Sequence, residues 1–168
     1  MASNTDNILN DFVTKLTTIT IANGYNFTPT YVGKVVKDMY DIGEFPQISV
    51  MVGSSEIKAE DDIGSVFREV MNMFIIGYVN ASTDIAETGS LTTQAENLIS
   101  DIKKVISAFI TTNINSVQSG YSGASYFIDI HNTPIKIFRL LDDKQNVGMV
   151  SLNFKVVSYR RDSSFTVS

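Results

Sequence analysis

Apolar side chains recur every three or four residues across residues 90–109, and this spacing places them on one face of a helix. The apolar face contains Leu91, Ala95, Leu98, Ile99, Ile102, Val105, Ile106 and Phe109. The opposite face, which we expect to be wet, carries Asn97, Asp101 and Lys104. The pattern therefore predicts one amphipathic helix that lies on a sheet.

The start of this helix has two candidate caps. Ser90 can accept a hydrogen bond from a free amide of the first turn, which is the usual role of an N-terminal cap. Thr93 with Glu96 has the spacing of a capping box and is the alternative. Both place the beginning of the helix near residue 90.

A second amphipathic helix is predicted near the N-terminus, over about residues 4–21. Its apolar stripe consists of Ile8, Leu9, Phe12, Val13, Leu16 and Ile19. Ser3 with Asp6, or Thr5, can cap its start, and Gly24 is well placed to end it. We expect this helix to pack on the sheet, or alternatively on a neighbouring subunit.

The long apolar run over residues 66–79 fits two structures. Residues Val66, Val70, Phe74 and Tyr78 have helical spacing. The β-branched and aromatic enrichment, the unbroken apolar centre and the late Gly77 favour a strand over residues 70–79, apolar on both faces. Such a strand must be covered on both faces, by a second layer of this chain or by another subunit.

Shorter strands are predicted on both sides of these elements. Their ranges are 25–36, 45–53, 125–132, 135–141 and 148–159. Pro29 limits the first to an edge strand or a broken strand, Gly53 closes the second, and Pro134 separates the third from the fourth. In the last strand the apolar face is Val150, Leu152, Phe154 and Val156, opposite Ser151, Asn153 and Lys155. Residues 54–64 are predicted to be a charged loop, and residues 110–125 another loop.

The order of elements predicts an α+β fold, with a mainly antiparallel sheet packed with two main helices. We expect a single domain over residues 1–168, with a polar tail at 160–168.

Composition limits the classes of function. Hydrophobic residues make up 43% of the chain, which is typical of a globular protein. The net charge of −5 disfavours a protein that binds DNA by neutralising phosphates. There is no cysteine, which excludes disulfides and cysteine nucleophiles, and neither a membrane-spanning run nor a signal peptide is evident.

Candidate catalytic chemistry is sparse. His131 is the one histidine, and a general base or metal ligand needs partners. Glu56-Ile57-Lys58, downstream of Asp41 and Pro46, has the skeleton of a metal-dependent nuclease, in which carboxylates hold a divalent ion. The carboxylate pairs Asp61-Asp62 and Asp142-Asp143 fit turns better than a site. We expect no enzyme activity, no catalytic residue, no cofactor and no metal site, with a small metal-dependent nuclease as the alternative.

The arrangement of segments resembles the tail terminator proteins of tailed bacteriophages, over residues 4–160. The resemblance depends on the N-terminal helix and four segments: 45–50 (FPQISV), the strand ending at 76–79 (IGYV), the helix around 95–102 (AENLISDI) and the terminal strand 154–160 (FKVVSYR).

This resemblance implies a structural virion protein of the tail or neck, assembled in the host cytoplasm. Six copies are expected to form a ring that caps the tail tube, stops its polymerisation and offers a docking surface to the head/neck connector, and to a sheath if the tail is contractile. Genomic DNA would pass through the lumen without specific binding, and no membrane is involved. The expected contact segments are residues 54–64, residues 110–125 and the tail after Tyr159. A head-completion, connector or tube protein is the alternative within the same setting.

Overall fold

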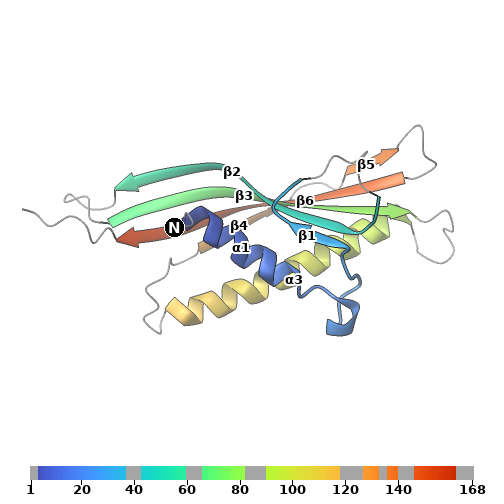
Figure 1. Ribbon diagram of the computed structural model, residues 1–168, viewed down its shortest axis with the longest axis horizontal. Coiled ribbons are helices and arrows are strands. Elements are labelled where there is room, and N and C mark those ends of the chain that lie inside the picture. The colour runs from blue at the N-terminus through green and yellow to red at the C-terminus, as the bar shows by residue number, and fades with distance from the viewer. Residues whose placement is uncertain are drawn as a thin grey trace, which may run out of the picture.

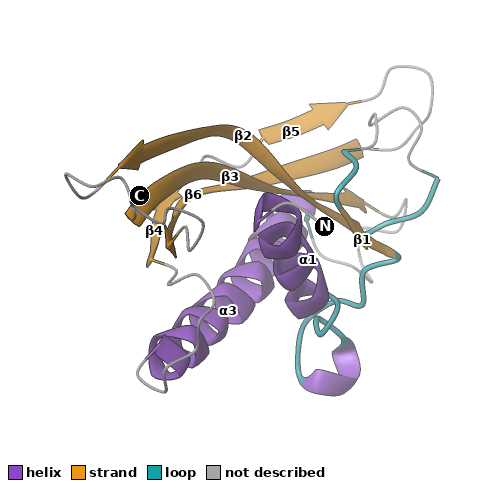
Figure 2. Ribbon diagram, turned by 60° about the vertical axis from the view of Figure 1, so that its left-hand side comes forward, coloured by secondary structure: helices purple, strands orange, loops and turns teal. Residues whose placement is uncertain are grey.

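The computed structural model describes residues 4–36, 43–59, 66–81, 90–117, 127–132, 136–139 and 146–161. The helical elements are α1 (Asn4–Leu16), the 3₁₀ turn η1 (Ile21–Asn23) and α3 (Leu91–Val117). The strands are β1 (Tyr31–Gly33), β2 (Gln47–Ala59), β3 (Val66–Ala81), β4 (Phe127–Asn132), β5 (Lys136–Arg139) and β6 (Asn146–Arg161). Both helices lie on one side of a curved sheet, as Figures 1 and 2 show.

The strands form one sheet in the order β1-β2-β3-β6-β4. β3 pairs with β6 from end to end, so β4 and β5, which also pair with β6, lie one after the other along its remaining edge. All of these pairs are antiparallel except β1 with β2. The predicted α+β class and mainly antiparallel sheet are confirmed, whereas the parallel pair was not predicted.

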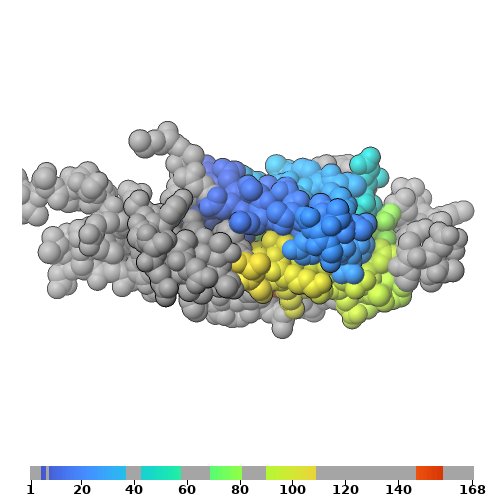
Figure 3. Space-filling model, turned by 90° about the horizontal axis from the view of Figure 1, so that it is seen from below, coloured from blue at the N-terminus to red at the C-terminus, as the bar shows by residue number. Residues whose placement is uncertain are grey.

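The core lies between the sheet and the two helices. Alternate residues of β3 point toward the helices, and so do the predicted apolar residues of β6. The fully or almost fully buried core residues of these strands are Met71, Met73, Ile75, Val79, Val150, Leu152, Phe154 and Val156. From the helix side, α1 and α3 lie side by side across this layer (Figure 3). The Phe12 ring of α1 lies 5.1 Å from the Phe154 ring, between centroids, which joins α1 to the central strands.

Residues 70–79 form a strand as expected, within the longer β3. The residues on its second face are only partly covered: Asn72, Phe74 and Ile76 are half-buried, and Tyr78 is buried. Among the described residues no helix lies on that face. Within the described part of the chain, the second face is therefore not covered by a layer of this chain, and the polar Asn72 interrupts its apolar character. Coverage of this face by another subunit, the other predicted arrangement, stays a prediction.

The N-terminal helix ends earlier than predicted, at Leu16 rather than near residue 21. A run of β-branched residues follows, and these have low helix propensity. The hydroxyls of Thr17 and Thr18 donate to the carbonyls of Thr14 and Lys15, at 2.7 Å each. Gly24, with φ of 82°, ends η1 instead of the helix.

The helix over residues 90–109 begins as predicted but continues to Val117. Ser90 is the cap, because its Oγ accepts a hydrogen bond from the Thr93 amide at 3.2 Å. The prediction of a loop from residue 110 is wrong for residues 110–117. Their Thr, Asn and Ser content indicated a loop, although Ile110 and Ile114 continue the four-residue spacing from Ile106.

β2 does not end at Gly53. Its register with β3 shifts between Val52 and Ser54, and pairing then resumes as far as Ala59 opposite Phe67. Gly53 is therefore a bulge and not a terminator. The charged loop predicted for residues 54–64 is a strand over 54–59, and residues 60–64 lie outside the described residues.

Asp101, predicted to face solvent, is fully buried. Its carboxylate accepts two hydrogen bonds from Asn26, one from the backbone amide and one from Nδ2, both at 2.8 Å. Lys104 lies 3.8 Å from the same carboxylate and is mostly exposed. These contacts attach the segment before β1 to α3. The free-energy cost of burying the Asp101 carboxylate is offset by these charge-assisted hydrogen bonds.

Replacing Asp101 with Ala is expected to lower the free energy of unfolding by about 3 kcal/mol, because two bonds to a carboxylate are lost and the Asn26 groups lose their acceptor. Urea unfolding followed by circular dichroism measures this loss. The control is Glu96→Ala, an exposed site on the same helix, with an expected change within about 0.5 kcal/mol. Equal effects of the two substitutions would contradict the role of Asp101.

Gly77→Ala is expected to lower the free energy of unfolding by about 1–3 kcal/mol through overpacking. A Cβ at this position would lie 2.8 Å from both Leu98 Cδ2 and Val150 Cγ2. Gly43→Ala is the matched control, because no described atom lies within 4 Å of the added Cβ. Thermal unfolding of both variants tests the close approach of α3 to β3, and an unchanged midpoint for Gly77→Ala would refute it.

Candidate interaction surfaces

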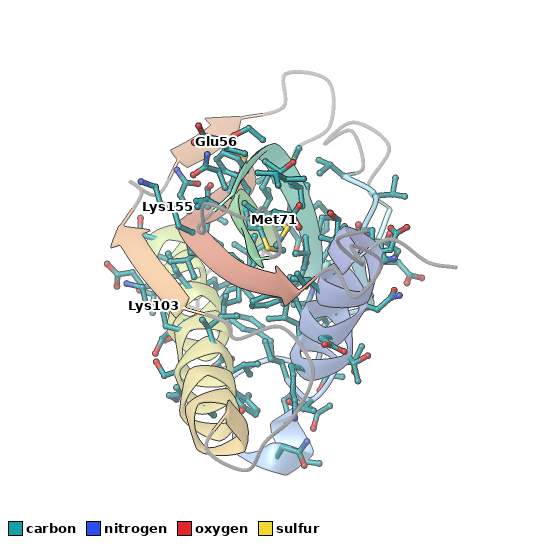
Figure 4. The ribbon with its side chains drawn as sticks, turned by 90° about the vertical axis from the view of Figure 1, so that its left-hand side faces the viewer. Glu56, Met71, Lys103 and Lys155 are labelled. Atoms are coloured by element: carbon teal, nitrogen blue, oxygen red, sulfur yellow. The ribbon has the colours of Figure 1, made fainter. Side chains whose placement is uncertain are left out.

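The described helices leave open the sheet face turned away from α1 and α3, called the outer face below (Figures 1 and 2). At its centre lie Ser54, Asn72, Asn153 and Lys155, on β2, β3 and β6. The Asn72 Nδ2 donates to Ser54 Oγ at 2.7 Å. Met71, on the opposite side of β3, lies inside the molecule, whereas Lys155 and Glu56 lie outside it (Figure 4). The centre of the outer face is therefore polar and almost neutral.

A hollow of about 470 Å³ lies at this polar centre. It is lined by Gly53, Ser54, Asn72, Met73, Phe74, Asn153, Phe154 and Lys155. Gly53 leaves room for the Phe74 ring, which lies against this glycine where a side chain would otherwise stand. The depression combines amide, hydroxyl and ammonium groups with the apolar side chains of Met73, Phe74 and Phe154, a mixture that suits contact with a protein surface.

The end of the outer face near β1 and β5 is apolar. Tyr78 and Val147 are buried there, and Phe45, Ile76 and Met149 pack against them. The segment after β1 covers part of the same end, since Ser49 Oγ donates to the Val35 carbonyl at 2.8 Å. Val35 itself has 65% of its surface exposed. The outer face thus combines an apolar end with a polar centre.

The exposed side of α3 forms another surface. A hollow of about 630 Å³ there is lined by Glu96, Ile99, Ser100, Lys103, Lys104 and Ser107. One carboxylate and two ammonium groups alternate with small hydroxyls, so this surface is weakly positive. The sequence predicted a solvated helix face here, although it placed Asp101 on it incorrectly.

The three predicted contact segments are only partly described. Residues 54–59 form the second half of β2, where Ser54, Ser55, Glu56 and Ile57 are exposed. Residues 110–117 belong to α3, and the chain after Tyr159 continues β6 to Arg161. Residues 60–64, 118–125 and 162–168 lie outside the described residues. The first segment is thus a strand with an exposed surface.

The residues considered for catalysis are not brought into a site within the described part of the chain. Glu56 lies on β2, and not in a loop as expected, while Asp41 of the nuclease pattern lies outside the described residues. His131 lies near the end of β4, opposite Asn153. No group of three described His, Cys, Asp or Glu residues is placed to hold a metal ion. The pairs Asp61-Asp62 and Asp142-Asp143 also lie outside the described residues.

The sequence alone does not define the outer face as one surface. Its signal was visible in the alternation of Ser151, Asn153 and Lys155 along β6. The neighbouring strands had to be placed in register before Ser54 and Asn72 joined these residues. Within the described residues, neither helix combines the length and apolar character needed to cross a bilayer.

Comparison with known proteins indicates the family of this chain. No curated protein matches the sequence. The model of one family, described as bacteriophage tail tube terminator protein, matches residues 2–147. This match covers both helices and all strands except most of β6. The chain therefore belongs to the bacteriophage tail tube terminator family.

Proposed function

We propose that six copies of this protein form a ring that caps the tail tube of a bacteriophage and stops its polymerisation. The observation that carries the proposal is the family match over residues 2–147. The fold supports it, because an open outer face and exposed strand ends offer surfaces for other subunits. In this proposal each subunit of the ring is a single domain over residues 1–168 with a polar tail at 160–168.

The mechanism is competition between surfaces. One face of the ring binds the last ring of tube subunits as a further tube ring would, and the other face does not accept another tube subunit. Growth stops without any covalent step, so the protein needs no nucleophile, cofactor or metal. The free ring face then binds the head/neck connector, and in a contractile tail the sheath also docks at this level.

Genomic DNA passes through the lumen of the ring in this proposal. A chain with 13 basic and 18 acidic residues carries a net charge of −5, which disfavours tight binding of the phosphates. The DNA therefore slides without sequence-specific binding. Assembly takes place in the host cytoplasm, and the finished ring stays in the virion at the junction of tail and neck.

The proposal predicts the mass and shape of the assembly. Light scattering is expected to give about six times the chain mass of 18.5 kDa, and negative-stain microscopy is expected to show sixfold rings as wide as a tail tube. If the ring forms only on the tube, the same rings are expected at one end of tubes from the same phage. A protein that stays monomeric and never appears at a tube end would refute the proposal.

Capping has its own measurable consequence. When this protein is added to tube subunits that are polymerising, the mean tube length is expected to fall as its concentration rises. Tubes that already carry a ring are expected not to elongate when fresh subunits are supplied. The control is an equal concentration of the protein after thermal unfolding, and continued growth beyond bound rings would contradict capping.

A further inference from the structure

One edge of the sheet is open over half of its length. β1 pairs with β2 only at residues 47–49, and β2 continues to Ala59. No described strand lies on this edge beyond Ser49 (Figure 1). The bulge at Gly53 bends this edge but does not end it, because pairing with β3 resumes at Ser54. An open strand edge presents backbone amides and carbonyls that can pair with another strand.

Among the described strands, the opposite edge of the sheet, formed by β4, is also open. β4 pairs with β6 on one side, and no described strand lies on its other side. The same chain therefore has two strand edges that can each accept a partner. Because these two edges are different surfaces, pairing between them is heterologous and generates a ring when the rotation closes.

The two open edges lie at the same level along the strands. Across the sheet Ser54 is opposite Asn72, Asn72 is opposite Lys155, and Lys155 is opposite Asp129 of β4. The same rows of pairs connect residues 50–55 of β2 with residues 128–132 of β4. By contrast, β5 is level with β1, since Lys136 and Tyr31 are joined through Met149, Tyr78 and Gln47.

The directions of the strands also allow β4 of one copy to pair with β2 of another. β2, β3, β6 and β4 are successively antiparallel, so β4 runs opposite to β2. Rotation about an axis roughly parallel to the strands changes neither direction nor level. It brings the β4 edge of one copy beside the open half of β2 in the next copy, as an antiparallel pair.

We propose that residues 50–55 of β2 pair with the outer edge of β4 in a second copy of this chain, so that the sheet continues from one subunit to the next. This inference rests on the proposed ring. A second copy fits better than an unrelated partner, because this chain carries both edges at one level and in the correct direction. The polar centre of the outer face then forms a continuous band around the ring.

Engineered disulfides test this pairing, because the chain contains no cysteine of its own. Opposite residues of an antiparallel pair have Cα atoms about 4.5–5.5 Å apart, which suits a disulfide. The variant S54C/D129C places cysteines on the same row, and E56C/D129C allows a shift of two residues. After oxidation, at least one of these variants is expected to give a ladder of cross-linked species up to six chains on a non-reducing gel.

The matched control is S55C/D129C. Ser55 is exposed and adjacent, but it points to the other face of the sheet. A shift of one residue would move all outer-face side chains of one copy to the helix side of the next, so this control is expected to give no ladder. A mixture of the S54C and D129C single variants is expected to give cross-linked dimers, even if a double variant fails to fold.

The cross-linking results distinguish a failure of this strand pairing from a failure of the proposed ring. Rings of normal size that give no cross-link in any of these variants would overturn the pairing and leave the proposed function intact. Dimers formed by the S54C variant alone would show that β2 pairs with β2, which also overturns it. If the unmodified protein forms no rings and does not cap tubes, the proposed function is refuted, and this pairing with it.

Discussion

The structure depends on the pairing of β3 along both of its edges. All 16 residues of this strand pair with β6, and most also pair with β2. This pairing fixes the alternation of side chains, which sends Met71, Met73 and Ile75 into the helix-covered core. The positions of α1, of α3 and of both sheet edges follow from it, because burying that apolar face is the main source of stability.

The pairing of β3 also makes the two faces of the sheet different. Where α1 and α3 cover the sheet, its helix side is filled by long apolar side chains, whereas the outer face has an apolar end and a polar centre. In the proposed ring, each subunit contacts copies of itself and the end of the tail tube. A sheet with one covered face provides a rigid platform for such contacts, and its edges and outer face remain accessible.

The Asp101–Asn26 contact supports the same arrangement from the helix side. Two hydrogen bonds of 2.8 Å join α3 to the segment that leads into β1. β1 covers only the first part of β2, so the position of this short strand decides where the open edge of the sheet begins. A buried carboxylate on α3 therefore contributes to the shape of a surface on the far side of β2.

The sequence by itself determined the amphipathic helix that begins at Ser90, the alternation along β6, the strand character of residues 70–79, the α+β class and the resemblance to tail terminators. These features are local, because periodicity reports which residues share a face and capping depends on a single turn. Tertiary structure decided that Asp101 is buried, that Gly53 is a bulge, that α3 extends to Val117 and that β1 pairs in parallel with β2. Of the predicted contact segments, residues 54–59 became part of a strand rather than a loop, and residues 54–57 are exposed. The burial of Asp101, the bulge at Gly53 and the parallel pairing of β1 each depend on a neighbour distant in sequence, and a pattern along one segment carries no record of which partner will lie against it. The extension of α3 differs, because the spacing of Ile110 and Ile114 was present in the sequence.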